Sequence, residues 1–186
     1  MKIKTIVCLA LILSGGLIGC STAARHRPDI QPPKVPSLTK VELKFVSVDS
    51  EETKGEDGHG KNAVDGKRGS YWHTQWQGAS PGLPHEIVIE LLPPSVIKGF
   101  TYMPRQDVSD HGTIKDYEFY VSGDGKNFGQ PVKTGTFEPG KGGSTEAFKP
   151  VKCRFIKLRA ISEVNGLPWT SAAEIGVVQS CGVDAR

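Results

Sequence analysis

Short runs in which apolar and polar residues alternate are the feature that most limits how this chain can fold. Residues 86–91, 117–121 and 156–160 each follow a two-residue period, with Ile87 and Ile89 on the same side of the first run. Alternation over short runs is typical of half-buried β-strands, and no stretch of the chain after residue 40 shows a convincing helical period. The sequence therefore predicts an all-β domain.

Clusters of glycine, proline, aspartate and asparagine separate these runs and mark turns, most densely at Ser122–Asn127. Eight strands are expected, near residues 41–48, 85–91, 95–103, 114–122, 131–137, 145–149, 152–161 and 172–179. Many short strands joined by turns favour a sandwich or a barrel. The connection 49–70 is long, polar and irregular, and long loops of that kind usually carry function.

The first nineteen residues are typical of a secretory signal peptide. Lys2 and Lys4 precede a short apolar run, which is too short to cross a bilayer comfortably and ends at Gly19-Cys20. This ending resembles the cleavage motif of bacterial lipoproteins, which implies that Cys20 is lipidated and becomes the new N-terminus. An ordinary secretory peptide is the alternative. Ser21 after the lipidated cysteine favours the outer membrane, so the expected location is the bacterial cell envelope, lipid-anchored.

Residues 20–40 are expected to be a linker between this anchor and a single folded domain at 41–180. The segment is rich in proline and poor in large apolar residues, so it favours extended backbone. At about 3.1 Å per residue, it could hold the domain on the order of 60 Å from a membrane.

Removal of the leader changes both the charge and the cysteine count. Loss of Lys2 and Lys4 lowers the formal charge from +3 to +1, which gives no electrostatic reason to expect nucleic-acid binding. With Cys20 used for lipid, Cys153 and Cys181 remain. In an oxidising compartment they could form a disulfide, and two buried free thiols are the alternative.

Several segments in one order and spacing resemble a known family. They are residues 62–66 (NAVDG), 70–74 (SYWHT), 102–107 (YMPRQD), 115–122 (KDYEFYVS) and 165–175 (NGLPWTSAAEI). Together they are similar to the discoidin domain, also called the coagulation factor V/VIII type C domain, and most of all to family 32 of the carbohydrate-binding modules. The resemblance covers about residues 41–179. It implies an eight-stranded jelly-roll β-sandwich of the galactose-binding-like kind.

The resemblance also implies a structural calcium ion that joins the Asp-Gly loop to the last strand. The matching oxygen donors are the side chains of Asp65 and Glu174, the Ser70 hydroxyl or carbonyl, and the carbonyls of Asn62, Lys67 and Ala173. Carboxylate, carbonyl and hydroxyl oxygens are the ligands that calcium takes in proteins. Without the resemblance, Asp65 reads as a turn residue and Glu174 as a solvated charge.

A ligand site for a sugar needs an aromatic plate and a few fixed polar groups. His73 and Arg105 match the polar residues of the galactose-type pattern, and Trp169 matches a loop aromatic. Trp76 is a further candidate, undecided between binding and packing, whereas Trp72 is expected in the core. The family often has asparagine shortly after the arginine, where this chain reads Val108-Ser109-Asp110-His111. The particular sugar is therefore left open.

Two other function classes compete with glycan binding. An enzyme could use His73, His111, Asp107 and Asp110, or Glu51 and Glu52, as acid–base groups. No nucleophile elbow, phosphate loop or zinc-type histidine spacing is present, so catalysis is not expected. A protein- or lipid-binding adhesion module is the stronger alternative, with Leu83, Val108 and Leu167 as its apolar loop residues. The expected function is a non-catalytic, membrane-anchored glycan-binding module.

Overall fold

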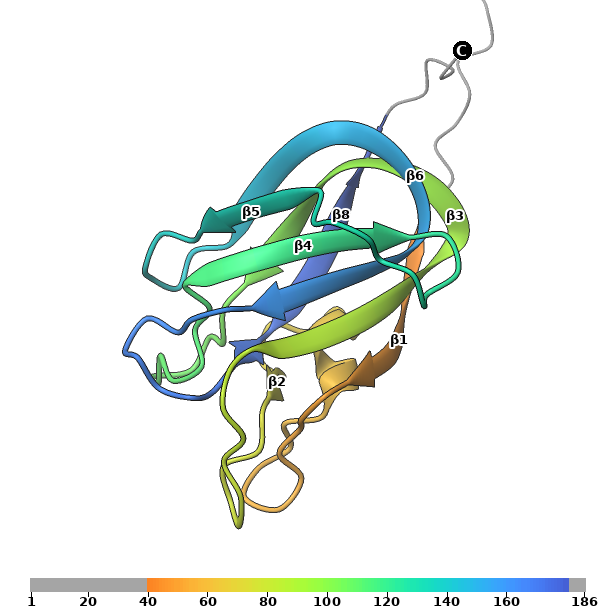
Figure 1. Cartoon of the computed structure of the whole chain (residues 1–186). Coiled ribbons are helices and arrows are strands. Elements are labelled where there is room, and N and C mark those ends of the chain that lie inside the picture. The colour runs from red at the N-terminus through yellow and green to blue at the C-terminus, as the bar shows by residue number, and fades with distance from the viewer. Residues whose placement is uncertain (1–39, 181–186) are drawn as a thin grey trace, which may run out of the picture. The chain divides into compact units, whose positions relative to one another are not determined.

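Two long bent strands determine the architecture of residues 40–180, the part of the chain that the computed structural model describes. β3 (His85–Met103) and β6 (Ser144–Ala160) pair along most of their length and arch over together from one layer to the other (Figure 1). The sequence predicted each as two separate strands, which is wrong. The register shifts between Glu90 and Ser95, around two prolines that cannot donate to the ladder, so the strand bends there without ending.

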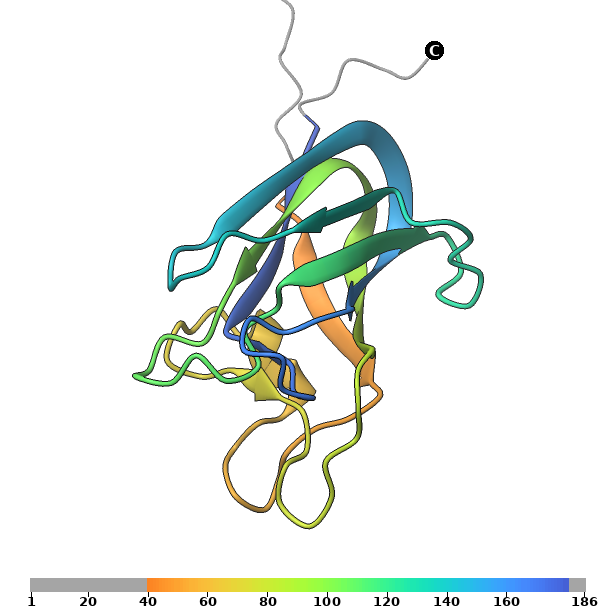
Figure 2. The same ribbon diagram turned by 60° about the vertical axis from the view of Figure 1, so that its left-hand side comes forward.

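The remaining strands extend these two into a sandwich (Figure 2). β1 (Glu42–Val48) pairs with the first half of β3, while β4 (Asp116–Ser122) pairs with the second half of β6 and with β5 (Lys133–Thr136). β8 (Glu174–Gln179) pairs with the second half of β3, and every pairing is antiparallel. The arrangement confirms the expected all-β jelly-roll sandwich.

Three short elements were not predicted from the sequence. β2 (Trp72–His73) pairs with β7 (Ser171–Ala172) in a separate two-stranded sheet, so the expected strand 172–179 is divided between β7 and β8. A 3-10 helix, η1 (Gly60–Val64), lies within the long connection 49–70. The small β2–β7 sheet brings residues about a hundred positions apart into direct contact.

Aromatic rings fill the space between the layers. Phe100 stacks on Phe119 with ring centroids 4.0 Å apart, and Tyr117 stacks on Phe137 at 4.1 Å. Such pairs add about 0.5–1.5 kcal/mol to the stabilisation from buried area. Trp72 is fully buried, as expected.

The loops that follow β1, β2, β3 and β6 meet at one end of the sandwich (Figures 1 and 2). Main-chain hydrogen bonds join them there: Thr74 donates to the carbonyl oxygen of Thr170, and Ser171 donates to that of Gly112. Among residues 40–180, no helix has the length and apolarity needed to cross a membrane. The predicted leader, Cys20, the linker and Cys181 lie outside the described residues.

Candidate functional site

One buried carboxylate organises the loop after β1. Glu52 is fully buried, and its two oxygens accept main-chain N–H bonds at 2.7–2.9 Å from Lys54, Gly55, Trp76 and Gln77. Burial alone would raise the pKa of Glu52, but these donors outweigh it and lower the pKa to about 2. The bonds join two loops that are distant in sequence, and they set the positions of Glu56 and Trp76.

His73 lies on β2 and is only 2% exposed. Its Nδ1 is 2.7 Å from the carbonyl oxygen of Thr74, so Nδ1 carries the proton and donates it to that oxygen. Burial lowers the pKa of His73, which keeps the imidazole neutral near pH 7. In this tautomer Nε2 holds a lone pair, so His73 presents a hydrogen-bond acceptor to the site.

Arg105 follows the end of β3, and its side chain is largely buried. Nε and Nη2 donate to the two carboxylate oxygens of Asp107, and Nη2 also donates to the hydroxyl of Tyr71 at 2.7 Å. A guanidinium fork can donate to two adjacent sugar hydroxyls, but in Arg105 this fork is occupied by Asp107. Nη1 makes no hydrogen bond to another described residue, so it is the remaining donor.

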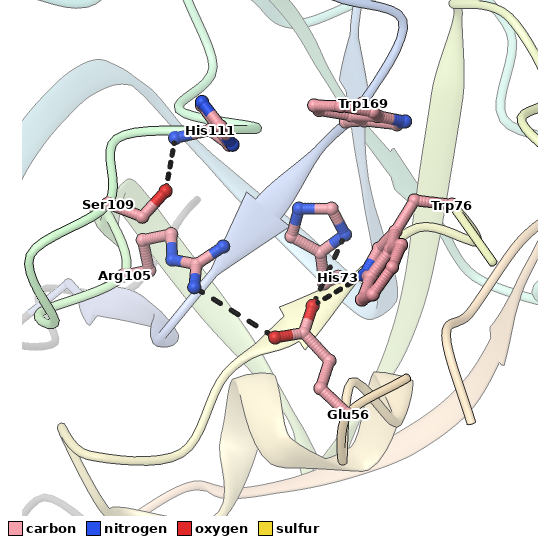
Figure 3. Close-up of a pocket in the computed structure, with 7 residues that line it drawn as sticks. All are labelled: Glu56, His73, Trp76, Arg105, Ser109, His111 and Trp169. Atoms are coloured by element: carbon pink, nitrogen blue, oxygen red, sulfur yellow. Dashed lines mark hydrogen bonds and ion pairs between the residues drawn. The ribbon is translucent and has the colours of Figure 1, made fainter. Parts of the chain in front are cut away.

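Glu56 and Trp76 form the side of the site opposite His111 (Figure 3). One Glu56 oxygen accepts the Tyr71 O–H at 2.6 Å, and the other accepts the Trp76 indole N–H at 3.0 Å. Gly55 leaves room for that indole, because a Cβ at Gly55 would lie 2.4 Å from Cζ2 of Trp76. Trp76 is 41% exposed and lines the pocket, so a ligand can contact it.

Trp169 forms the upper wall of the site in Figure 3, and His111 lies next to it. The ring centroid of Trp169 is 6.1 Å from that of His73 and 5.4 Å from that of His111. Its indole N–H donates to the Ser80 hydroxyl at 2.9 Å, which fixes the ring in its loop. Trp169 is half-buried and lines the pocket.

A buried histidine fixes the loop that carries Trp169. His85 is fully buried, with Nδ1 2.6 Å from a carboxylate oxygen of Asp49 and Nε2 2.9 Å from the carbonyl oxygen of Pro168. Both partners are acceptors, so both ring nitrogens donate and the imidazole is charged. Burial alone would lower the pKa of His85, but the bond to Asp49 outweighs it and raises the pKa. This ion pair connects β1, β3 and the Trp169 loop.

Glu163 has a similar role between two other loops. Its buried carboxylate accepts main-chain N–H bonds from Gly112, Asn165 and Leu167 at 2.6–3.1 Å. Backbone donors on two loops therefore converge on one carboxyl group, which joins the loop after β3 to the loop after β6.

These loops enclose a pocket of about 260 Å³. Its lining residues are Glu56, His73, Trp76, Arg105, Ser109, His111 and Trp169 (Figure 3). The structure thus brings all four predicted ligand-binding residues, His73, Trp76, Arg105 and Trp169, to one place. The sequence reasoning missed Glu56, Ser109 and His111 as members of the site. The length and polarity of the 49–70 loop, together with the Val108–His111 departure from the family pattern, were the only signals that pointed towards them.

The pocket presents polar groups of complementary kinds. Arg105 Nη1 donates, His73 Nε2 accepts, and the carboxylate oxygens of Glu56 accept. The two indole rings supply the apolar surface. A ligand that fits must offer several groups able both to donate and to accept, beside an apolar face. Sugar hydroxyls on a pyranose ring meet both demands.

The residues expected to bind calcium also lie together. Asp65 accepts hydrogen bonds from the main-chain N–H of Lys67 and from the Ser70 hydroxyl, both at 2.8 Å, and Ser70 also contacts the Lys67 carbonyl oxygen at 3.1 Å. Burial raises the pKa of Glu174, and the nearby Asp65 carboxylate raises it further. Oε1 of Glu174 is buried without a hydrogen-bond partner. Two adjacent carboxylates and an unpartnered oxygen fit a bound cation.

Asn62 and Ala173 are the other members of the expected set. Asn62 is buried, and its side-chain amide donates to the carbonyl oxygens of Asp57 and Tyr71 at 2.9 and 3.3 Å, while Ala173 is fully buried beside Glu174. Residues 40–180 contain no group of three His, Cys, Asp or Glu side chains placed to bind a metal. The expected set would depend on two carboxylates with main-chain and hydroxyl oxygens.

Cys153 is buried and has no disulfide partner among residues 40–180, and burial raises the pKa of its thiol to about 11. Because Cys181 lies outside the described residues, their pairing stays a prediction.

Fold and site together define a jelly-roll module with a polyhydroxyl-compatible pocket at its loop end. The F5/8 type C domain model matches residues 46–175. The chain belongs to the F5/8 type C (discoidin) family.

One protein of known sequence and two solved structures illustrate which part of the chain is similar to known proteins. A sialidase from Micromonospora viridifaciens is 36% identical over 141 residues, which are 75% of this chain and 22% of that protein. The CBM32-5 module of Clostridium perfringens, solved in complex with GalNAc-β-1,3-galactose, superposes with a TM-score of 0.67 at 34% identity, covering 74% of this chain and 95% of the module. The family 32 module of C. perfringens NanJ, solved in complex with galactose, gives 0.63 at 31% identity, covering 73% and 93%. The chain spans about a fifth of the length of that sialidase.

Proposed function

We propose that this protein is a non-catalytic carbohydrate-binding module whose loop-end pocket binds galactose-type sugars. The observation that carries this proposal is the pocket's combination of one arginine donor, two acceptors and two indole rings. Support comes from the two modules of C. perfringens, which share the fold at above 30% identity and were solved with galactose or a galactose-containing disaccharide.

In this proposal each residue has one role. Nη1 of Arg105 donates to one sugar hydroxyl, Nε2 of His73 accepts from another, and Trp169 packs against the C–H face of the ring. A monosaccharide has about a dozen heavy atoms, and about 0.3 kcal/mol for each gives roughly 4 kcal/mol, or millimolar affinity. Many copies on one surface would strengthen such weak binding through avidity.

The arrangement gives little support to glycoside hydrolysis. That chemistry commonly uses a pair of carboxyl groups on either side of the scissile bond. Glu56 is the single carboxylate among the residues that line this pocket in the described chain, and the Asp107 carboxylate is held by Arg105. Both carboxylate oxygens of Glu52 accept hydrogen bonds from four backbone N–H groups, so Glu52 is not available as the second carboxyl group.

A protein- or lipid-binding adhesion module on the same fold is the alternative, and exposed Val108 is the observation that favours it. Leu83 and Leu167, the other two apolar candidates, are partly buried. One fully exposed aliphatic side chain is a small apolar surface, so the proposal remains glycan binding.

A structural calcium ion would be held by Asp65, Glu174, Ser70 and the carbonyls of Asn62, Lys67 and Ala173. When bound, it would neutralise two adjacent carboxylates and fix the 62–70 loop to the start of β8. Tyr71 follows that loop and bonds both Glu56 and Arg105, so the ion would also steady the sugar pocket.

The lipid anchor at Cys20 is likewise part of the proposal, resting on the leader pattern of residues 1–20. With this anchor, the module would be located at the outer membrane of a bacterial cell envelope. The linker 20–40 would connect the module to the membrane.

A glycan array probed with calcium present tests the proposed function. The protein from Ser21 to Arg186 would be compared with Arg105→Ala and Trp169→Ala variants. Binding to galactose-type glycans that both variants lose is the expected result. A folded protein that binds no glycan, even in multivalent display, would exclude it and favour protein or lipid adhesion.

A further inference from the structure

The charged side chains at the pocket are unequally paired. Arg105 is the one cation that lines it among the described residues, and Asp107 holds that cation with two hydrogen bonds. The Arg105 hydrogen bond lowers the pKa of Asp107, so this carboxylate is ionised near neutral pH. The guanidinium is therefore already neutralised before a ligand arrives.

Glu56 adds a second carboxylate that has no such partner. Its two hydrogen-bond donors, Tyr71 and Trp76, are neutral groups. Nη2 of Arg105 lies 3.9 Å away but points its protons at Asp107 and Tyr71. Nδ1 of His73 lies 3.7 Å from Glu56, yet donates its proton to the Thr74 carbonyl at 2.7 Å.

The nearby Lys141 does not pair with Glu56. Its ammonium donates to the main-chain carbonyls of Arg105 and Ser109 and helps to lower the pKa of Asp107, and Lys141 does not line the pocket. Among the residues that line the pocket, Glu56 is therefore the charged group that has no hydrogen bond to a group of opposite charge.

We infer that Glu56 is a specificity-determining residue that restricts this pocket to neutral sugars and excludes their uronic acids. The inference rests on the proposed function and names the ligand class of the same site. A hydroxyl can donate to Glu56 or His73 and accept from Arg105, so a neutral sugar satisfies all three groups. A carboxylate has no proton to donate and brings a second negative charge into the same small pocket.

The repulsion does not require direct contact between the ligand carboxylate and Glu56. The pocket holds about 260 Å³, so any ring substituent inside it lies within about one Debye length of Glu56, where screening by salt is incomplete. The bidentate carboxylate recognition that an arginine usually offers is also blocked, because Asp107 occupies that face of Arg105. Repulsion is therefore not offset by a strong new bond.

The test is a pair of NMR titrations of the ¹⁵N-labelled protein from Ser21 to Arg186, with methyl β-galactoside and with methyl β-galacturonoside. We expect the uronic acid to bind at least fivefold more weakly, and the difference to shrink as salt is added. Glu56→Gln, which keeps the size of the side chain and removes its charge, should bring the two dissociation constants together. Glu138→Gln removes an equal charge from an exposed residue outside the pocket and should leave the ratio unchanged.

Each other outcome has a distinct meaning. Equal binding of both glycosides by the unaltered protein would overturn the inference while leaving the proposed function in place. A ratio that is the same in Glu56→Gln as in the unaltered protein would assign the selectivity to other groups and would also overturn it. Binding of neither glycoside, even in multivalent display, would overturn the proposed function and this inference together.

Discussion

Glu52 offers the sharpest test of how the site is held together, because one buried anion there fixes two loops. The perturbation is Glu52→Gln. A glutamine keeps one carbonyl oxygen but replaces the other acceptor with an amide that must itself donate, so one pair of the four backbone N–H bonds is lost. We expect the variant to be less stable than the unaltered protein at pH 7, and to bind sugar more weakly because Glu56 and Trp76 lose their support.

The pH dependence gives the magnitude. The folded pKa of about 2 lies below the ordinary value of 4.5, so the stabilisation is fully present above pH 4.5 and is lost as pH falls towards 2. At about 1.4 kcal/mol per pKa unit, the full linkage is about 3 kcal/mol, of which about 2 kcal/mol is lost between pH 7 and pH 3.

Urea unfolding followed by tryptophan fluorescence at pH 7 and pH 3 measures this directly. Other carboxylates also titrate in the window, so the quantity to compare is the pH-dependent change in the free energy of unfolding, with and without Glu52. The change should be smaller in Glu52→Gln by about 2 kcal/mol, whereas Glu138→Gln should match the unaltered protein. If Glu52→Gln loses as much stability as the unaltered protein on going to pH 3, the linkage reasoning is wrong.

Three further predictions address the remaining parts of the site. Trp169→Ala should weaken galactoside binding at least tenfold in an NMR titration. Its thermal stability should change little, because the Trp169 side chain is only half-buried. Unchanged affinity would show that Trp169 does not contribute to binding. The pKa of His85, measured by NMR, should lie above its ordinary value of 6.5. The stabilisation that this histidine contributes is then fully present below pH 6.5 and is lost as pH rises through the folded pKa. A measured pKa at or below 6.5 would contradict the assignment of both ring nitrogens as donors. In scanning calorimetry, calcium should raise the melting temperature of the unaltered protein by several degrees and that of Asp65→Asn by much less. An equal rise in both proteins would mean that the ion binds elsewhere.

The site owes its geometry to buried charges beneath the loops. Glu52, Glu163 and the Asp49–His85 pair each join segments that are far apart in sequence. Loops held by several charge-assisted bonds need less ordering when a ligand binds, and this matters for a pocket that gains only a few kilocalories per mole from a monosaccharide. We therefore expect these residues to influence affinity without touching the sugar.

The fold was predictable because its signal is local. Period-two alternation in β3, β4 and β6 reflects half-buried strands, and turn residues separated most of them correctly. The continuity of β3 was not predictable, since Pro93-Pro94 signals a break in the sequence, whereas the bend between two layers tolerates both residues. The two-residue pairing of β2 with β7 was also missed, because so short a strand has no period to detect.

The sequence by itself determined the fold class, the family and the four ligand-site candidates His73, Trp76, Arg105 and Trp169, since these depend on residue types at set spacings. Only the tertiary structure decided which hydrogen-bond donors and acceptors of these residues stay available to a ligand. It assigned the Arg105 fork to Asp107, the His73 proton to Thr74, and a place in the pocket to Glu56. Hydrogen-bond partners across the loops are chosen by three-dimensional proximity, which spacing along the chain does not encode. The lack of a charged partner for Glu56 follows from those pairings, so the inferred preference for neutral sugars depends on the structure.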